Sequence, residues 1–325
     1  MGEGKPKVAF YWCAACGGCE EAVVDLAEKI LDVIQIVDIA FWPVALDFKR
    51  KDVEELADGQ LAVAFVNGAI RTSEQAEMAR LLRRKSKVVI AFGACAQMGG
   101  IPSLANLWDR ESIFRAVYQE CPSVVNEQHT TPQTQYKEDG RTVTLPVFWN
   151  TVRTLSQVID VDYSVPGCPP TPKLLLDAVE TLLSGKLPPK GSVLAPDHAL
   201  CQECPRRETR PEKLLLKEFK RPHEIVADQE TCLLAQGLLC LGPATRAGCG
   251  ARCIEGNMPC TGCFGPTSRV RDFGAKALSA IASLADSNEE AEIGAILAKI
   301  VDPVGTMYRY SLAASPIRRR RKGGE

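Results

Sequence analysis

The 325-residue sequence predicts an α/β protein built on a doubly wound parallel sheet, and three observations support this. Short, almost wholly apolar runs recur along the first 190 residues, each long enough for one strand. Segments with helical spacing lie between them, and strands that are apolar on both faces suit a parallel sheet covered by helices. Cysteine-rich loops directly follow two of the runs, where the functional groups of such sheets gather. The fold predicted for residues 1–190 is therefore flavodoxin-like.

Four runs in this first part are dominated by apolar and β-branched residues and are expected to form strands: 7–12, 33–41, 61–66 and 87–92. Helices are expected from Glu20 to Leu31 and at about 73–85, where apolar residues recur at helical spacing. From 120 to 146 the sequence turns polar, which indicates an exposed insertion with a hairpin around Asp139-Gly140.

The second part of the chain differs in composition. A Pro-, Lys- and Arg-rich segment from 185 to 222 leads into a cysteine-dense region that runs to about 266. Two helical patterns follow, near 270–285 and 288–301. We therefore expect two domains, at 1–190 and 191–325.

Charge and hydropathy exclude several classes of function. Lys plus Arg number 39 and Asp plus Glu 40, so the net charge of −1 lacks the basic excess that a general nucleic-acid-binding protein needs. The N-terminus has no apolar signal-peptide segment, and no apolar run approaches the roughly 18 to 20 residues that cross a bilayer. We expect a cytoplasmic protein with no direct membrane insertion, and a basic tail at 318–322 that is a solvated end.

Eight of the 14 cysteines fall between Cys201 and Cys263. They form two CxxC pairs, one CxxxC pair and one wider pair: Cys201/Cys204, Cys260/Cys263, Cys249/Cys253 and Cys232/Cys240. Disulfides are rare in cytosolic chains, so this density indicates metal or redox chemistry. Eight thiols suit two four-cysteine zinc sites or two [4Fe–4S] clusters, and spacing alone does not distinguish them. The small, apolar and proline neighbours favour a ferredoxin-like, iron–sulfur-binding C-terminal domain.

The other six cysteines lie apart along the first domain: Cys13, Cys16, Cys19, Cys95, Cys121 and Cys168. Two of their loops follow predicted strands and should open at the same edge of the sheet. Glycine or proline frames Cys95 (GACAQMGG) and Cys168 (VPGCPP), as in turns. We expect a third four-sulfur site here, with two cysteines spare.

The sequence offers little for other kinds of catalysis. Its three histidines, His129, His198 and His223, have no paired spacing. Neither the phosphate-loop motif G-x-x-x-x-G-K-[ST] nor the dinucleotide motif G-x-G-x-x-G occurs. We expect no catalytic residue and no nucleotide site on this chain.

Three motifs in order, CGGCEE (16–21), GACA (93–96) and GCPP (167–170), resemble the proximal-cluster motifs of [NiFe]-hydrogenase small subunits. Residues 232–266 resemble the second, ferredoxin-like cluster region of that family. The segment 160–170 (DVDYSVPGCPP) and the all-cysteine C-terminal set are most similar to its cytosolic group, in particular to gamma subunits of F420-non-reducing (methyl-viologen-reducing) hydrogenases. The resemblance covers nearly the whole chain.

This resemblance implies three [4Fe–4S] clusters, each with four cysteine ligands. They would be a proximal cluster on Cys16, Cys19, Cys95 and Cys168, a medial cluster on Cys249, Cys253, Cys260 and Cys263, and a distal cluster on Cys201, Cys204, Cys232 and Cys240. Which of these eight C-terminal cysteines bind the medial cluster and which bind the distal one stays open. All-thiolate ligation lowers cluster potentials, which suits electrons destined for a flavin, a ferredoxin or another iron–sulfur protein.

The proximal ligands have one alternative. Cys13-x-x-Cys16-x-x-Cys19 with Cys168-Pro169 imitates the bacterial ferredoxin run, a ligation that would leave Cys95 idle. The GACA motif favours Cys95, so Cys13 and Cys121 are expected to be ordinary thiols. Glu21 matches the acidic position beside the proximal cluster and is a candidate proton relay, although a helix N-terminus also favours acidic residues.

The function that the resemblance implies is that of an electron-transfer small subunit of a cytosolic [NiFe]-hydrogenase. Dihydrogen would be split on a separate large (alpha) subunit. Electrons would pass through the three clusters to a partner such as heterodisulfide reductase, with a small [2Fe–2S] delta subunit. Alternatives of the same class are the gamma subunit of F420-reducing hydrogenase and a sulfhydrogenase small subunit. More remote ones are the related subunit of respiratory complex I, whose first motif has adjacent cysteines, and a zinc-stabilised interaction protein.

Overall fold

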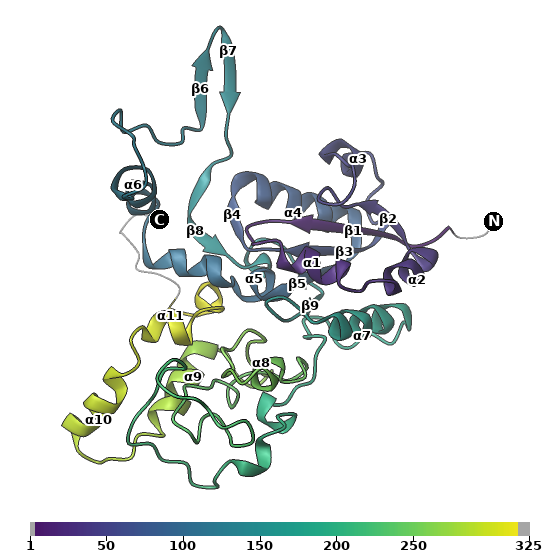
Figure 1. Cartoon of the computed structure of the whole chain (residues 1–325). Helices are drawn as coiled ribbons and strands as arrows, with labels where there is room; N and C mark the ends of the chain where they lie inside the picture. Colours follow the sequence, from purple (N-terminus) through teal and green to yellow (C-terminus); the bar gives the residue numbers. More distant parts are fainter. Residues whose placement is uncertain (1–3, 318–325) are drawn as a thin grey trace.

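The computed structural model describes residues 4–317, and a five-stranded parallel sheet forms its centre (Figure 1). The strands lie in the order β2-β1-β3-β5-β9. Their bounds are Asp38–Phe41 (β2), Lys7–Trp12 (β1), Leu61–Asn67 (β3), Ser86–Phe92 (β5) and Tyr163–Val165 (β9). Along the chain this is the order second, first, third, fourth, fifth, which is that of flavodoxin. The predicted α/β class and parallel sheet are confirmed.

Helices cover both faces of the sheet, as the apolar strands require. Alternate residues of each strand enter two cores, so that Val8 and Phe10 lie on one face and Ala9 on the other. The first core packs against α1 (Gly18–Val24) and α7 (Pro172–Leu183), and the second against α3 (Arg50–Glu54) and α4 (Ser73–Lys85). The predicted helix at 73–85 coincides with α4.

The prediction for residues 20–41 was partly wrong. The expected single helix is broken after Val24 by a turn with Ala27 at φ 51°. The expected strand begins only at Asp38, because residues 29–36 form the helix α2 (Lys29–Ile36). Ile30, Val33 and Ile34 recur at helical spacing and line one apolar groove, and a short apolar run does not distinguish strand from helix by periodicity alone.

The polar insertion is an exposed hairpin, as predicted. Strands β6 (Gln135–Glu138) and β7 (Arg141–Thr144) pair antiparallel and project from the body at the top of Figure 1. Asp139 and Gly140 both have positive φ, at 48° and 75°, which is the geometry of a two-residue hairpin turn. At its base, β4 (Ile70–Thr72) pairs antiparallel with β8 (Phe148–Arg153).

The second part of the chain consists of loops and short helices around a core of its own. Residues 191–317 form isolated bridges but no strand. The helices are α8 (Arg252–Glu255), α9 (Phe273–Ala282), α10 (Glu290–Ala298) and α11 (Pro303–Met307), of which α9 and α10 confirm the two predicted helical patterns. The end of this part returns to the first, where the Gly100 amide donates to the Tyr310 carbonyl at 3.0 Å.

Two sequence predictions are not decided by the structure. The second part has a core of its own, but Phe264 packs in a core of the first part, and the boundary at residue 190 stays a prediction. The basic tail at 318–322 lies outside the described residues. Within 4–317, no helix is long and apolar enough to span a bilayer.

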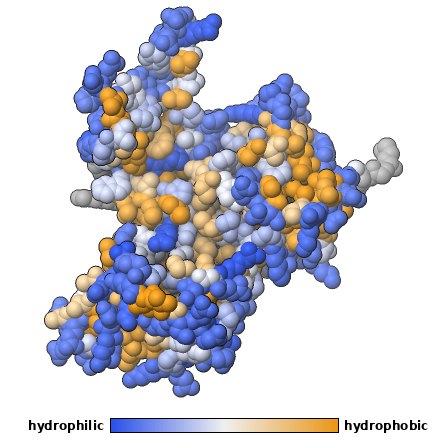
Figure 2. All heavy atoms as spheres, in the orientation of Figure 1, coloured by the Kyte–Doolittle hydropathy of each residue, from blue (hydrophilic) through white to orange (hydrophobic). Residues whose placement is uncertain are grey.

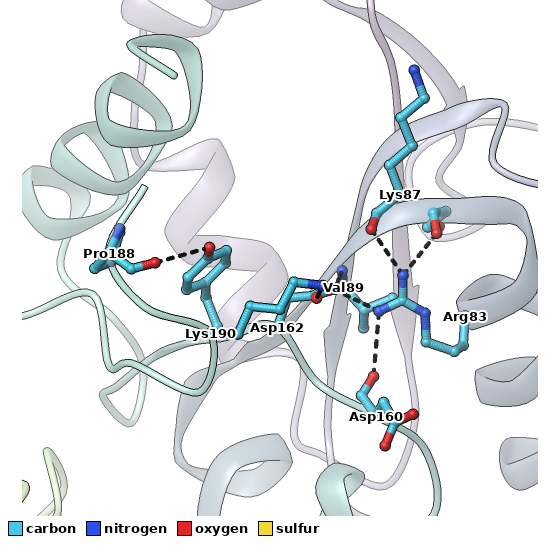
Figure 3. Close-up of polar contacts among 9 residues, drawn as sticks. Arg83, Lys87, Val89, Asp160, Asp162, Pro188 and Lys190 are labelled. Atoms are coloured by element: carbon cyan, nitrogen blue, oxygen red, sulfur yellow. Dashed lines mark hydrogen bonds and ion pairs between the residues drawn. The ribbon is translucent and has the colours of Figure 1, made fainter. Parts of the chain in front are cut away.

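A buried carboxylate fixes β9, the strand that leads to Cys168 (Figure 3). Asp162 is 5% exposed and accepts hydrogen bonds from the Val89 amide (2.8 Å), from Arg83 and from Lys190 (2.8 Å). Burial by itself raises the pKa of this carboxyl, but the hydrogen bonds from Lys190, Arg83 and Val89 outweigh it and hold the pKa below its usual value. The network joins α4, β5 and the segment after α7 at the edge of the sheet opposite the cysteine loops.

Replacing Asp162 with Asn is expected to lower the free energy of unfolding by about 2 kcal/mol, because the Arg83 guanidinium loses its buried counter-ion. Since folding lowers the pKa of Asp162, this stabilisation is present above the carboxyl's unfolded pKa of about 3.9. It is lost as the pH falls through the lower folded value. Urea midpoints of wild type and variant should differ at pH 7 and converge below about pH 4.

The exposed Lys173–Asp177 pair supplies the control for this variant. Asp177→Asn should leave the urea midpoint nearly unchanged, because exposed ion pairs contribute little to stability. Equal losses in the two variants would contradict the structural role of Asp162.

Candidate metal centres

Four cysteines meet at the carboxyl edge of the parallel sheet. Cys16 and Cys19 follow β1, Cys95 follows β5, and Cys168 follows β9. Burial raises the pKa of Cys95 to about 12, and the neighbouring Cys168 and Cys16 contribute to the rise. The pKa of Cys19 is raised by burial and then by Cys95, Cys168 and Cys16. The four thiols predicted as proximal ligands therefore lie together, drawn from three separate loops.

Glycines make room for these sulfurs. A Cβ atom on Gly93 would lie 2.3 Å from the Cys19 sulfur, and one on Gly100 would lie 2.3 Å from the Cys95 sulfur. Both glycines have positive φ, so an L side chain would be strained there as well. The loops are joined by a 2.7 Å hydrogen bond from the Ala94 amide to the Gly167 carbonyl. Gly93 and Gly100 thus leave room beside the sulfurs of Cys19 and Cys95.

The predicted distal cysteines line one small cavity: Cys201, Cys204, Cys232 and Cys240. Burial raises the pKa of Cys201 to about 11, Cys240 adds to this, and Arg210 opposes it. Gly242 lies against two of the sulfurs. A Cβ atom added to it would lie 3.3 Å from the Cys201 sulfur and 3.6 Å from the Cys240 sulfur.

Of the four predicted medial cysteines, three lie together and the fourth lies apart from them. The pKa of Cys263 is raised to about 12 by burial and then by Cys249, with a smaller effect of Cys253, so these three lie together. Cys260 lies between this set and the distal one. Its amide donates to the Cys240 sulfur at 3.4 Å, and its own pKa is raised by burial, then by Cys240 and, less, by Cys263. Its place among the medial ligands stays a prediction.

The three sets follow one another in a row. The Cys263 sulfur of the middle set accepts a hydrogen bond from the backbone of Cys168 in the proximal set. At the other side, the Cys260 amide donates to the Cys240 sulfur of the distal set. Cysteines from residues 16 to 263 therefore form one continuous series from the sheet edge into the second core.

Two acidic residues near these cysteines were not predicted. Glu20 is 5% exposed and accepts hydrogen bonds from the Trp42 indole and the Asn67 amide, while burial raises its pKa. Glu203 accepts from the amides of Gly248 (3.0 Å) and Gly250 (3.1 Å), and so joins the Cys201–Cys204 loop to the Cys249 loop. The position of Glu203 inside a CxxC motif was a signal for it, and Glu20 lies next to Cys19 in the CGGCEE motif, but nothing local showed that its carboxylate would be buried.

The remaining candidates lie outside the three sets. Glu21 is exposed on α1, and its role as a proton relay stays a prediction. Cys13 is buried at the end of β1, where burial raises its pKa, and its amide donates to the Asn67 carbonyl. Cys121 lies in the segment before the hairpin, with Ser123 3.2 Å away.

The donor set fits an iron–sulfur cluster better than a hard cation. Cysteine thiolates are the ligands of such clusters and of zinc, whereas magnesium and calcium prefer oxygen. Among residues 4–317 no group of three or more His, Cys, Asp or Glu side chains is arranged to hold a single metal ion. The fit therefore rests on four thiols at one place and on glycines that leave room beside the sulfurs of Cys19 and Cys95.

Residues 16–182 match the family described as NADH ubiquinone oxidoreductase, 20 Kd subunit, and the chain belongs to this family. Relatives that match over nearly their whole length are hydrogenase subunits. The chain is 40% identical to an F420-non-reducing hydrogenase iron-sulfur subunit of Archaeoglobus profundus, over 97% of this chain and 98% of that one. It is 39% identical to an F420-non-reducing hydrogenase subunit of Methanothermobacter thermautotrophicus, over 96% of each chain. The chain is thus a hydrogenase subunit and an iron–sulfur oxidoreductase component.

More distant proteins agree with the fold. Sulfhydrogenase 2 subunit delta of Pyrococcus furiosus is 26% identical over 80% of this chain and 86% of that one. The [NiFeSe] hydrogenase from Desulfovibrio vulgaris Hildenborough superposes with a TM-score of 0.53 at 17% identity, over 81% of this chain and 94% of that one. The last comparison shows that the fold is shared.

Proposed function

We propose that this chain is the electron-transfer small subunit of a cytosolic [NiFe]-hydrogenase. It would carry electrons from H2 oxidation at a separate large subunit to a partner such as heterodisulfide reductase. The observation that carries the proposal is the series of three cysteine sets, in which Cys168 contacts Cys263 and Cys260 contacts Cys240. A row of thiol sites in contact suits conduction between two surfaces.

Each cysteine set would hold one [4Fe–4S] cluster, with the proximal, medial and distal ligands predicted above. When bound, such clusters supply one-electron transfer at a potential set by their ligands, hydrogen bonds and exposure. This chain's own residues shield part of the proximal site and leave room in it: Cys19 and Cys95 are buried, and Gly93 and Gly100 leave space beside their sulfurs. The Glu203 carboxylate adds negative charge beside Cys249, whose pKa is raised mainly by burial and further by this carboxylate.

In this proposal the large subunit oxidises H2 and this chain carries the electrons away. Oxidation of one H2 at the large subunit gives two protons and two electrons, and the electrons leave through this chain one at a time. The large subunit would dock at the carboxyl edge of the sheet. Cys16 is exposed there, and the segment after Cys95 presents Ile101, Leu107 and Trp108, which are 51%, 50% and 65% exposed. Apolar side chains at this density are typical of an obligate interface.

Two partners are proposed as acceptors, a small [2Fe–2S] delta subunit and heterodisulfide reductase. The relatives that match over nearly the full length are described as F420-non-reducing, which favours this interpretation over the gamma subunit of an F420-reducing enzyme. The low potentials of all-thiolate clusters support an iron–sulfur or flavin acceptor.

The test is H2-driven reduction of methyl viologen by the complex of this chain with its large subunit, purified anaerobically. We expect dye reduction that depends on H2 and is lost when this chain is left out. A large subunit that reduces the dye equally well alone, or an intact complex that does not reduce it under H2, would overturn the proposal. Supplying the reduced complex with heterodisulfide reductase or with F420 separates the two acceptor classes.

A further inference from the structure

Two open cavities flank the contact between Cys240 and Cys260. The larger, of about 410 Å³, lies between residues 219–222, 258–261 and 299–309, and Cys260 forms part of its wall. The smaller, of about 250 Å³, lies between residues 240–244 and α9, and Cys240 forms part of its wall. Leu241 borders both cavities. Leu241 itself is buried, so the two cavities on either side of it give the approach to Cys260 and Cys240.

The charged side chains that line the two cavities are almost all basic, and beside them Lys299 forms an ion pair with the exposed Glu218 at 3.7 Å. Six basic side chains line the two cavities: Arg210, Lys220, Arg221, Lys276, Lys299 and Arg309. Among the described residues of the lining, the acidic side chain is that of Asp302, which accepts a hydrogen bond from the Gly305 amide at 2.8 Å. Since the whole chain has a net charge of −1, this concentration of positive charge is a local feature.

Exposed apolar side chains accompany the basic ones. Met258 and Val301 line the larger cavity and are 50% and 73% exposed. Figure 2 shows apolar patches within a mostly hydrophilic surface on the second part of the chain, at the bottom of the view. Apolar centres with a charged surround are the anatomy of protein–protein interfaces, in which complementary charge sets the partner and the association rate.

We propose that this basic surface docks an acidic electron-carrier protein, which receives electrons where Cys240 and Cys260 meet. The inference rests on the proposed function and specifies the chemistry of its acceptor. The acceptor's acidic face would pair with the basic side chains of the two cavities, and each docked carrier would gain one electron. The two electrons from one H2 therefore reduce two one-electron carriers, and the two protons are released to solvent from the large subunit.

The test uses the complex of this chain with its large subunit and an acidic [4Fe–4S] ferredoxin as the probe. The variant combines Arg221→Glu with Lys276→Glu, one exposed basic residue from each cavity. At low ionic strength we expect kcat/KM for the ferredoxin to fall about tenfold or more, with the difference narrowing as salt is raised. H2-driven reduction of methyl viologen, a small cation that needs no protein docking, should keep its wild-type kcat. The control combines Lys51→Glu with Lys87→Glu, which changes the net charge equally on exposed residues of the first domain.

The inference would be overturned by a ferredoxin rate unchanged in the variant, by the same loss in the control, or by no ferredoxin reduction from a wild-type complex that reduces the dye. Failure of the proposed function is distinguishable, because a wild-type complex would then not reduce methyl viologen under H2. A variant that loses ferredoxin and dye reduction together would also overturn the inference, since its effect would not be one of docking.

Discussion

Cys168→Ser is expected to abolish H2-driven methyl viologen reduction, whereas Cys13→Ser is expected to retain it. Cys168 lies with the other proximal thiols, and its backbone contacts the Cys263 sulfur, so it occupies the junction between two sets. Changes one shell away from metal ligands commonly cost 10- to 100-fold in affinity or activity, so loss of a ligand should exceed about 100-fold. Serine is a poor substitute because its hydroxyl is a harder, weaker donor to iron than a thiolate.

Cys13 is the matched control because it is a buried cysteine only three residues from Cys16. It packs in the core between the sheet and α4, where serine is close in size. Equal loss in the two variants would favour the ferredoxin-type ligation of Cys13, Cys16, Cys19 and Cys168. In that case Cys95→Ser should be active, and this third variant decides between the two ligand sets.

Gly93→Ala is expected to prevent assembly of the proximal centre. The added Cβ would lie 2.3 Å from the Cys19 sulfur and 3.5 Å from the Gly167 carbonyl oxygen, at a backbone φ of +85°. Gly59→Ala is the matched control, because Gly59 also has a positive φ, of +72°, but nothing lies within 4 Å of its Cβ position. Both variants carry a backbone penalty of about 1 to 2 kcal/mol, and the contact with Cys19 is what differs.

The measurement is iron and sulfide per chain in the two purified variants. Gly93→Ala should lose about four irons and most H2-driven dye reduction, and Gly59→Ala should keep both. A Gly93→Ala protein with the full iron content would show that the glycine does not shape the site.

Much of the fold could be predicted because its signals are local. The strands at 7–12, 61–66 and 87–92 are short apolar runs between polar segments, and the structure has them at Lys7–Trp12, Leu61–Asn67 and Ser86–Phe92. Because parallel strands end at one edge, the loops with Cys16 and Cys95 could be expected to meet. Strand β9 was not predicted, since its three residues are too few to show a pattern.

The parts that could not be predicted depend on distant contacts. The Glu20 carboxylate is buried because Trp42 and Asn67, 22 and 47 residues away, donate to it. The order of the three sets in space depends on Cys168 meeting Cys263, far along the chain. Spacing could group the cysteines into pairs, but only the folded chain shows that Cys260 lies beside both C-terminal sets.

The central claim is that twelve of the 14 cysteines hold three iron–sulfur clusters, and the metal content of the anaerobically purified chain tests it most directly. Three [4Fe–4S] clusters require about twelve irons and about twelve sulfides per chain. We predict these values, with zinc near zero. About two zinc ions per chain with no sulfide would contradict the claim, because the dense cysteines would then be structural zinc sites with no role in electron transfer.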